Sequence, residues 1–208
     1  MASILDLLKT QTGSQLISKA KNETSYNDSE IKALLGAALP LLVSVMVKNS
    51  KSSEGAKNLN EALADPRHNG DLLQNLSSAK SNMLEQEGGK ILNHVLGNNQ
   101  GDISKVLANT LDLDANSVTK VLKIAAPVLL SILGNQKRKD NVNEGSISDL
   151  IGSVLGANSS HDRSFLETIL DKDNDGNIID DIGGIILGGG LGNKKGGGSI
   201  LGGYAGGR

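Results

Sequence analysis

Cysteine and tryptophan are absent from the 208 residues of this chain, and aromatic residues amount to only 1%. Without cysteine the protein has no disulfide, no thiolate metal site and no cysteine nucleophile. Because base stacking needs aromatic faces, a surface that binds nucleic acid is not expected. The formal net charge of −2 also provides no general attraction to phosphate. The core must therefore be built from Leu, Ile, Val and Ala.

The sequence also lacks the marks of a signal peptide and of a membrane span. Its first residues, MASILDLLKTQTG, carry no basic leader, and Asp6 and Lys9 interrupt their apolar run. The longest apolar run, residues 37–47, contains Pro40 and is shorter than the roughly 18 residues of a membrane-spanning helix. We therefore expect a cytoplasmic protein without a membrane span. Export by a route that needs no signal peptide is the open alternative.

Helical periodicity is what the sequence does contain. From Ile31 to Met46, apolar residues recur at spacings of three and four. Asn27, with Glu30 three residues later, fits a capping box at the start of this helix. The second half of the helix is apolar nearly all round, so we expect it to be the most buried element. Pro40 lies inside the pattern and predicts a kink.

A second segment repeats this construction 87 residues later. NSVTKVLKIAAPVLLSILGNQ aligns with SEIKALLGAALPLLVSVMVKN, which places Pro127 on Pro40. Each copy follows a shorter helical segment and precedes an amphipathic one, SSEGAKNLNEALADP in the first case and GSISDLIGSVLG in the second. We interpret the repeat as an internal duplication whose central helices pack about a pseudo-twofold axis. A chance match of two proline-containing helices is the alternative.

These patterns predict an all-α protein, a duplicated helical bundle followed by two further segments. Residues 1–87 form the first helical half and residues 88–160 the second. Residues 161–182 form an acidic segment, and residues 183–208 form a glycine-rich packing helix and tail.

The acidic segment contains the most specific chemical signal, DKDNDGNIIDDI at residues 171–182. Asp171, Asp173 and Asp175 occupy positions one, three and five of an EF-hand-like calcium loop, and Gly176 occupies position six. Alternate side chains of such a turn point inward, and glycine adopts the left-handed backbone that the turn needs. Asn177, at position seven, would contribute its carbonyl oxygen.

The end of this loop departs from the usual pattern. The bidentate glutamate of position twelve is missing, since Ile182 stands there, and Asp181 is the expected substitute, with Asp180 as the alternative. Ligands that are all oxygen favour Ca²⁺ over zinc or copper, and magnesium prefers a smaller octahedral site. The alternative to a metal site is an Asp/Asn-rich turn that caps a helix beginning near Ile178.

Glycines recur at intervals of four directly after the loop, at Gly184, Gly188, Gly192 and Gly196. On a helix they would form one smooth face that allows another helix to approach closely. Because each glycine lowers helix stability in water by about 1 kcal/mol, such a helix needs an anchor and a partner surface. A flexible, low-complexity tail is the alternative.

Other candidate sites are weaker. His68, His94 and His161 stand far apart in the sequence, and each is expected at the surface or at a helix cap rather than as a ligand. GGK, residues 88–90, lacks the first glycine of a phosphate loop, and no serine stands in a nucleophile elbow. QKRK, residues 136–139, is a short basic cluster at a helix end, where it complements the helix dipole.

Four stretches carry a resemblance to a known family. They are ILNHVLG at residues 91–97, the Ala126-Pro127 pair in a leucine-rich helix, LGNQKR at residues 133–138 and GSISDL at residues 145–150. In these the chain resembles the bacterial domain of unknown function 937, strongly over residues 88–186 and more loosely before them. Members of that family often continue into an acidic loop and a glycine-rich ending, as here. The resemblance implies an all-helical bacterial protein and carries no established reaction.

Three functions are compatible with these observations. The expected one is a non-enzymatic structural or interaction protein that forms a homo-oligomer, with calcium fixing its C-terminal arm. A nucleic-acid-binding regulator built on helix-turn-helix-like units is the first alternative, although the acidic balance and the lack of a basic recognition helix count against it. An enzyme or secreted effector without a recognisable site is the second.

Overall fold

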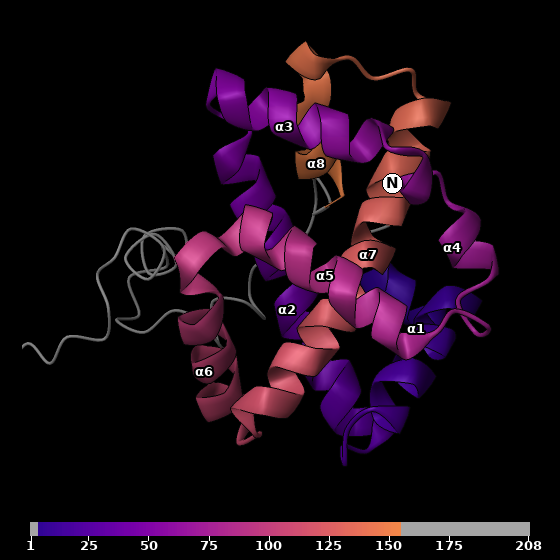
Figure 1. Ribbon diagram of the computed structural model, residues 1–208, viewed down its shortest axis with the longest axis vertical. Coiled ribbons are helices and arrows are strands. Elements are labelled where there is room, and N and C mark those ends of the chain that lie inside the picture. Colours follow the sequence, from indigo (N-terminus) through magenta and orange to yellow (C-terminus); the bar gives the residue numbers. More distant parts are fainter. Residues whose placement is uncertain (1–3, 155–208) are drawn as a thin grey trace, which may run out of the picture.

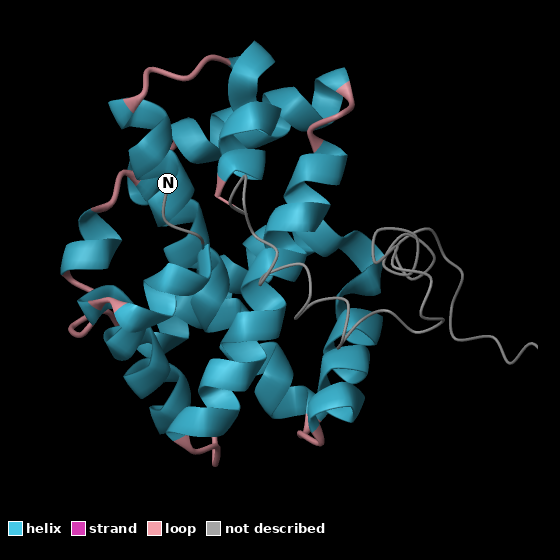
Figure 2. Ribbon diagram, turned by 180° about the vertical axis from the view of Figure 1, so that it is seen from behind, coloured by secondary structure: helices cyan, strands magenta, loops and turns pink. Residues whose placement is uncertain are grey.

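The computed structural model describes residues 4–154, and helices make up nearly all of this range. In chain order the elements are η1 (Ile4–Lys9), α1 (Gln11–Asn22), α2 (Asp28–Asn49), α3 (Ser53–Ala64), η2 (Pro66–His68), α4 (Asp71–Gln74), α5 (Ser81–Leu96), η3 (Gly97–Asn99), α6 (Gln100–Leu111), α7 (Ala115–Lys139), η4 (Glu144–Ser146) and α8 (Ile147–Ser153). Short loops join them (Figure 2). The prediction of an all-α fold is confirmed for residues 4–154, which contain no strand.

Helix α2 begins with the capping box that its sequence predicts. The Asn27 side chain accepts hydrogen bonds from the backbone N–H groups of Ser29, at 2.9 Å, and of Glu30, at 3.1 Å. The Glu30 carboxylate in turn accepts one from the Asn27 N–H at 2.7 Å, so donors that the first turn leaves free are satisfied. Buried residues then extend from Ile31 to Met46 on all sides of the helix. They are covered because α1, α3, α5, α6, α7 and α8 all contact α2.

Helix α7 shares the centre of the molecule with α2. It contacts α1, α2, α3, α5, α6 and α8, and its most extensive contact is with α5. Both long helices continue through their prolines, Pro40 and Pro127, which are buried. The expectation that α2 is a central and highly buried element agrees with the structure, in which α7 shares that central position with it.

The starts of these two helices are joined by one tyrosine. The Tyr26 hydroxyl accepts a hydrogen bond from the Asp114 backbone N–H at 2.7 Å and donates one to the Asp114 carbonyl oxygen at 2.9 Å. Burial raises the pKa of this hydroxyl above its ordinary value. Asp114 is also the N-cap of α7, because its carboxylate accepts from the backbone N–H groups of Asn116 and Ser117. The first turns of α2 and α7 are thus held side by side.

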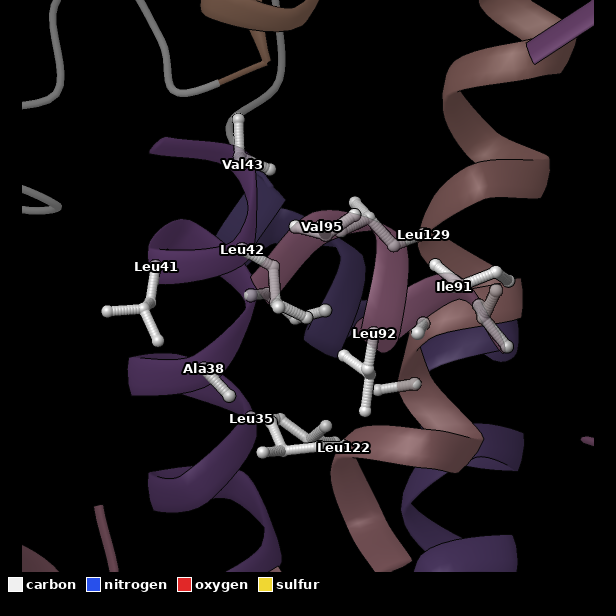
Figure 3. Packing of buried hydrophobic residues seen from close by; sticks show 14 of the residues in the cluster. Leu35, Ala38, Leu41, Leu42, Val43, Ile91, Leu92, Val95, Leu122 and Leu129 are labelled. Atoms are coloured by element: carbon white, nitrogen blue, oxygen red, sulfur yellow. The ribbon is translucent and has the colours of Figure 1, made fainter. Parts of the chain in front are cut away.

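The core between α2, α5 and α7 is aliphatic, as the composition requires. Figure 3 shows Leu35 of α2 and Leu122 of α7 pointing toward one another, with Leu92 of α5 close by. All three side chains are fully buried. Seen as a whole, α3 and α8 lie at one end of the body, α6 and the start of α7 lie at the other, and α5 crosses between them (Figure 1).

Helix α5 runs without interruption across the boundary expected between residues 87 and 88. Residues before and after that point belong to one helix that packs on α2 and α7. The two halves defined from the sequence therefore share an element in this part of the chain.

Two of the described helices, α2 and α7, are long and apolar enough to cross a membrane by length and composition. In each, 72% of the apolar window is buried inside the protein, as in the core helices of a helical bundle. The absence of a membrane span stays a prediction.

Candidate functional site

The predicted calcium ligands lie outside the described residues. Asp171, Asp173, Asp175, Asn177 and Asp181, together with the alternative ligand Asp180, all follow residue 154. Within residues 4–154 no group of three or more His, Asp or Glu side chains is placed to hold a metal ion. The metal site predicted from the sequence therefore stays a prediction. The candidate sites of the helical body are formed by other residues of the range 4–154.

An open groove runs along α5, between the end of α1 and the first half of α7. Its volume is about 750 Å³. Polar and charged residues dominate its walls, which are formed by Glu23, Ser81, Asn82, Glu85, Gln86, Gly89, Lys90, Asn93 and Lys123. We refer to this set as the α5 groove.

Two adjacent glycines shape the α5 groove. A Cβ atom on Gly88 would lie 1.7 Å from the Lys123 carbonyl oxygen, so only glycine allows α5 to cross α7 this closely. A Cβ atom on Gly89 would meet nothing nearer than the Lys123 Cε atom at 3.8 Å, which leaves the floor of the groove hollow. The GGK sequence, which fails as a phosphate loop, thus brings Lys123 beside α5.

The charges of the groove have no partners inside the described part of the chain. Two carboxylates, Glu23 and Glu85, and two ammonium groups, Lys90 and Lys123, line it. None of these four side chains forms a hydrogen bond or an ion pair with another residue of the range 4–154. Glu23, Glu85 and Lys123 are only partly exposed to solvent. The groove therefore presents charges of both signs that are free to bind something else.

A second polar cluster joins the end of α3 to α5. Arg67 donates to both carboxylate oxygens of Asp65, at 3.0 Å from Nε and 2.7 Å from Nη2, and to both oxygens of Glu87, at 2.8 and 2.9 Å from Nη1. The hydrogen bonds from the Arg67 side chain, with one from its backbone N–H, hold the pKa of Asp65 well below its usual range. The same two carboxylates, Asp65 first, raise the pKa of the Arg67 guanidinium.

His68 lies beneath this cluster, and its placement corrects the expectation of a surface or cap residue. Its side chain is buried, because η2 turns the imidazole inward against α3. Nδ1 lies 2.7 Å from the Ala62 carbonyl oxygen, so Nδ1 carries the hydrogen of that bond. Nε2 has no hydrogen-bond partner and lies 3.7 Å from a Glu87 carboxylate oxygen. His94 is exposed, as expected, and His161 lies outside the described residues.

Arg138 fastens the same region to α7. Its guanidinium donates four hydrogen bonds of 2.8–3.0 Å to backbone carbonyl oxygens, those of Ala64, Asp65, His68 and Gly134. Three of these carbonyls belong to the end of α3 and to η2, which α7 thereby caps. Arg138 of the QKRK cluster thus joins distant parts of the chain, and no sequence pattern signals this because three of its four partners are at least 70 positions away.

The two regions differ in what they can do chemically. The cluster of Asp65, Arg67, His68 and Arg138 is satisfied internally except at His68 Nε2, and it holds three helices together. The α5 groove has unpaired donors and acceptors on an open surface. Among its lining residues the one hydroxyl, Ser81, has no hydrogen-bonded base. The charged groups of the groove are therefore available to bind another molecule.

Comparison with known proteins places the chain in a family. A family model described as a bacterial protein of unknown function (DUF937) matches residues 6–136. The chain belongs to this family, and the match spans η1 to most of α7, which includes the α5 groove. It begins well before the segment in which the resemblance is strongest and ends before the acidic loop. Searches of curated proteins and of solved structures returned no match.

Proposed function

We propose that this chain is a non-enzymatic structural or interaction protein that self-associates, with a calcium ion ordering its C-terminal arm. The α5 groove carries the proposal, because it combines an open shape with charged side chains of both signs that lack partners in the described residues. Such a surface suits the binding of another protein surface, whose polar groups can supply the missing partners. The aliphatic core behind it supplies a rigid support.

The proposal includes an internal duplication of the helical body. Two features support it: α2 and α7 both contain a buried proline at the aligned position, and their N-caps, Asn27 and Asp114, are also 87 residues apart. Buried residues recur at aligned positions in the two helices, among them Ile31, Leu35, Ala38 and Leu42 in α2 and Val118, Leu122, Ala125 and Leu129 in α7. Equivalent faces of two equivalent helices would then form the centre of the body.

The sequence of the acidic segment supports the proposed calcium-bound C-terminal arm. Asp171, Asp173 and Asp175, the Asn177 carbonyl and Asp181 would supply oxygen ligands to one ion. The ion would offset the mutual repulsion of these carboxylates at the start of a glycine-rich helix that is weak by itself. That helix, anchored at its first turn, would present its glycine face to the helical body or to a second copy.

Calorimetric titration of the whole chain with calcium tests the arm. We expect one binding event per chain that the Asp173→Ala and Asp175→Ala variants each lose. Binding should also stabilise the protein, by about 2.7 kcal/mol at a hundredfold excess of calcium over the dissociation constant.

Asp162→Ala is the matched control, since it removes a neighbouring carboxylate from outside the loop and should bind calcium like the wild type. An absence of heat and of any shift in melting temperature at millimolar calcium would show that the acidic segment is a helix cap.

A further inference from the structure

One face of α5 consists of polar residues along most of its length. Asn82, Glu85, Gln86, Gly89 and Asn93 follow the spacing of three and four that places residues on one side of a helix. This stripe extends over about 16 Å, at about 1.5 Å per residue. Gly89 stands near its centre and leaves the surface hollow there. A second helix can therefore approach α5 closely at this point.

The charged residues beside this stripe are partly buried and have no partner among the described residues. Glu85 and Lys123 are half-buried, and neither has an ion-pair or hydrogen-bond partner among residues 4–154. Each of them is therefore available to form an ion pair with an occupant that brings an opposite charge.

An exposed methionine lies on the same helix. Met83 is 62% exposed and is the one large hydrophobic side chain of the described range that is strongly exposed. It lies in the first turn of α5, one residue from Asn82 and two from Glu85. Methionine adapts its shape to a partner surface and is often used as a contact residue. Helix α5 thus carries an exposed apolar side chain in addition to the charged residues that line the groove.

We infer that the α5 groove is where two copies of this chain meet, about a twofold axis close to Gly89. The groove contains two carboxylates and two ammonium groups, so it is electrostatically complementary to itself. In an antiparallel pairing of α5 with its symmetry mate, Glu85 of each copy reaches the Lys90 and Lys123 ammonium groups of the other. This assignment rests on the proposed self-association and names the surface that produces it.

Two charge-reversed variants test this pairing. The first carries Glu23→Lys and Glu85→Lys, which makes the groove entirely basic, and the second carries Lys90→Glu and Lys123→Glu, which makes it entirely acidic. Like charges then face each other in each variant alone, and we expect self-association to weaken at least about tenfold in sedimentation velocity. In an equimolar mixture opposite charges face each other, so association returns.

Matched controls carry the same net charge changes at exposed positions outside the groove: Glu54→Lys with Glu144→Lys, and Lys51→Glu with Lys139→Glu. They should associate like the wild type, and circular dichroism should show all four variants folded. Wild-type assembly that both groove variants retain would overturn the inference and leave the proposed self-association standing. Loss of assembly without recovery in the mixture would overturn the twofold pairing. A wild type that is monomeric at every concentration would overturn both.

Discussion

Two arginines hold the end of α3 against the rest of the molecule. Arg67 binds the carboxylates of Asp65 and Glu87, and Arg138 binds four backbone carbonyls. Gly134 completes the contact, because a Cβ atom there would lie 2.2 Å from the His68 carbonyl oxygen. This junction links α3, α5 and α7 through polar contacts, although the surrounding core is aliphatic.

Acid should weaken this junction through Asp65. Its pKa in the folded protein lies below the ordinary value of 3.8, so its contribution to stability is fully present above pH 3.8 and is lost as the pH falls below that value. The Asp65→Asn variant should be less stable than the wild type near pH 6, and the difference should shrink steadily below about pH 4. Urea unfolding followed by circular dichroism between pH 6 and pH 2.5 measures it.

Asp149→Asn is the control, because Asp149 is exposed and forms no ion pair or hydrogen bond with another described residue. A stability difference for Asp65→Asn that stays constant across this pH range would contradict the role given to the ionised carboxylate.

Replacing Arg138 should have a larger effect. The Arg138→Met variant keeps much of the aliphatic stem but leaves carbonyl oxygens of the α3 end without their donor. We expect a loss of about 2 kcal/mol or more in the free energy of unfolding. Lys139→Met, one position along and exposed, should change it by less than about 0.5 kcal/mol. Equal effects for the two variants would show that the four hydrogen bonds contribute little.

Some contacts of individual residues could be predicted from the sequence and others could not. The Asn27 and Glu30 capping box was predictable because both partners lie within one helical turn. Arg138 and His68 were not, because Arg138 binds backbone groups of distant segments and His68 is buried by a turn that follows Pro66. Contacts to a distant backbone leave no pattern of residue types in the chain.

At the scale of elements, the crossing of α5 over α7 organises the molecule. It is the most extensive contact between two helices among those described, and it depends on Gly88. Apolar periodicity predicted α2, α3 and α7 close to their observed positions. The boundary between residues 87 and 88, which rests on the internal repeat rather than on periodicity, falls inside α5. The short distance between α5 and α7 could not be predicted from the sequence. The role of Gly88 becomes clear only once α7 is known to lie opposite it.

The two glycines of α5 provide a direct test of this crossing. Gly88→Ala should destabilise the protein by about 1–3 kcal/mol, because the added methyl group would collide with the Lys123 carbonyl and force the helices apart. Gly89→Ala is the matched control, and at concentrations too low for self-association it should stabilise the protein by up to about 1 kcal/mol, since alanine favours the helix and meets no close atom within one chain. Thermal unfolding measures the stability of both variants. Equal stability of Gly88→Ala and Gly89→Ala would contradict the close crossing of α5 and α7.

At the scale of the whole molecule, charge is distributed unevenly. Acidic and basic residues are equal in number within residues 4–154, so the formal excess of −2 belongs to the rest of the chain. A neutral body carries no general repulsion between copies, which favours self-association. The acidic loop would concentrate negative charge in the arm unless a cation binds there.

The sequence predicted the all-α class and the two central helices, because a 3.6-residue apolar rhythm is a local property. It did not predict the α5 groove, whose lining comes from α5, from α7 and from Glu23 at the end of α1, a hundred positions before Lys123. The two adjacent glycines of α5 were the available signal. Their meaning depended on which helix packs against them.

Sedimentation equilibrium of the whole chain, at several concentrations, in calcium and in chelator, tests self-association most directly. We predict a weight-average mass above the 21.6 kDa of one chain that rises with concentration both in calcium and in chelator, because the α5 groove lies outside the acidic loop. A mass of 21.6 kDa at every concentration, with calcium and without it, would contradict the account.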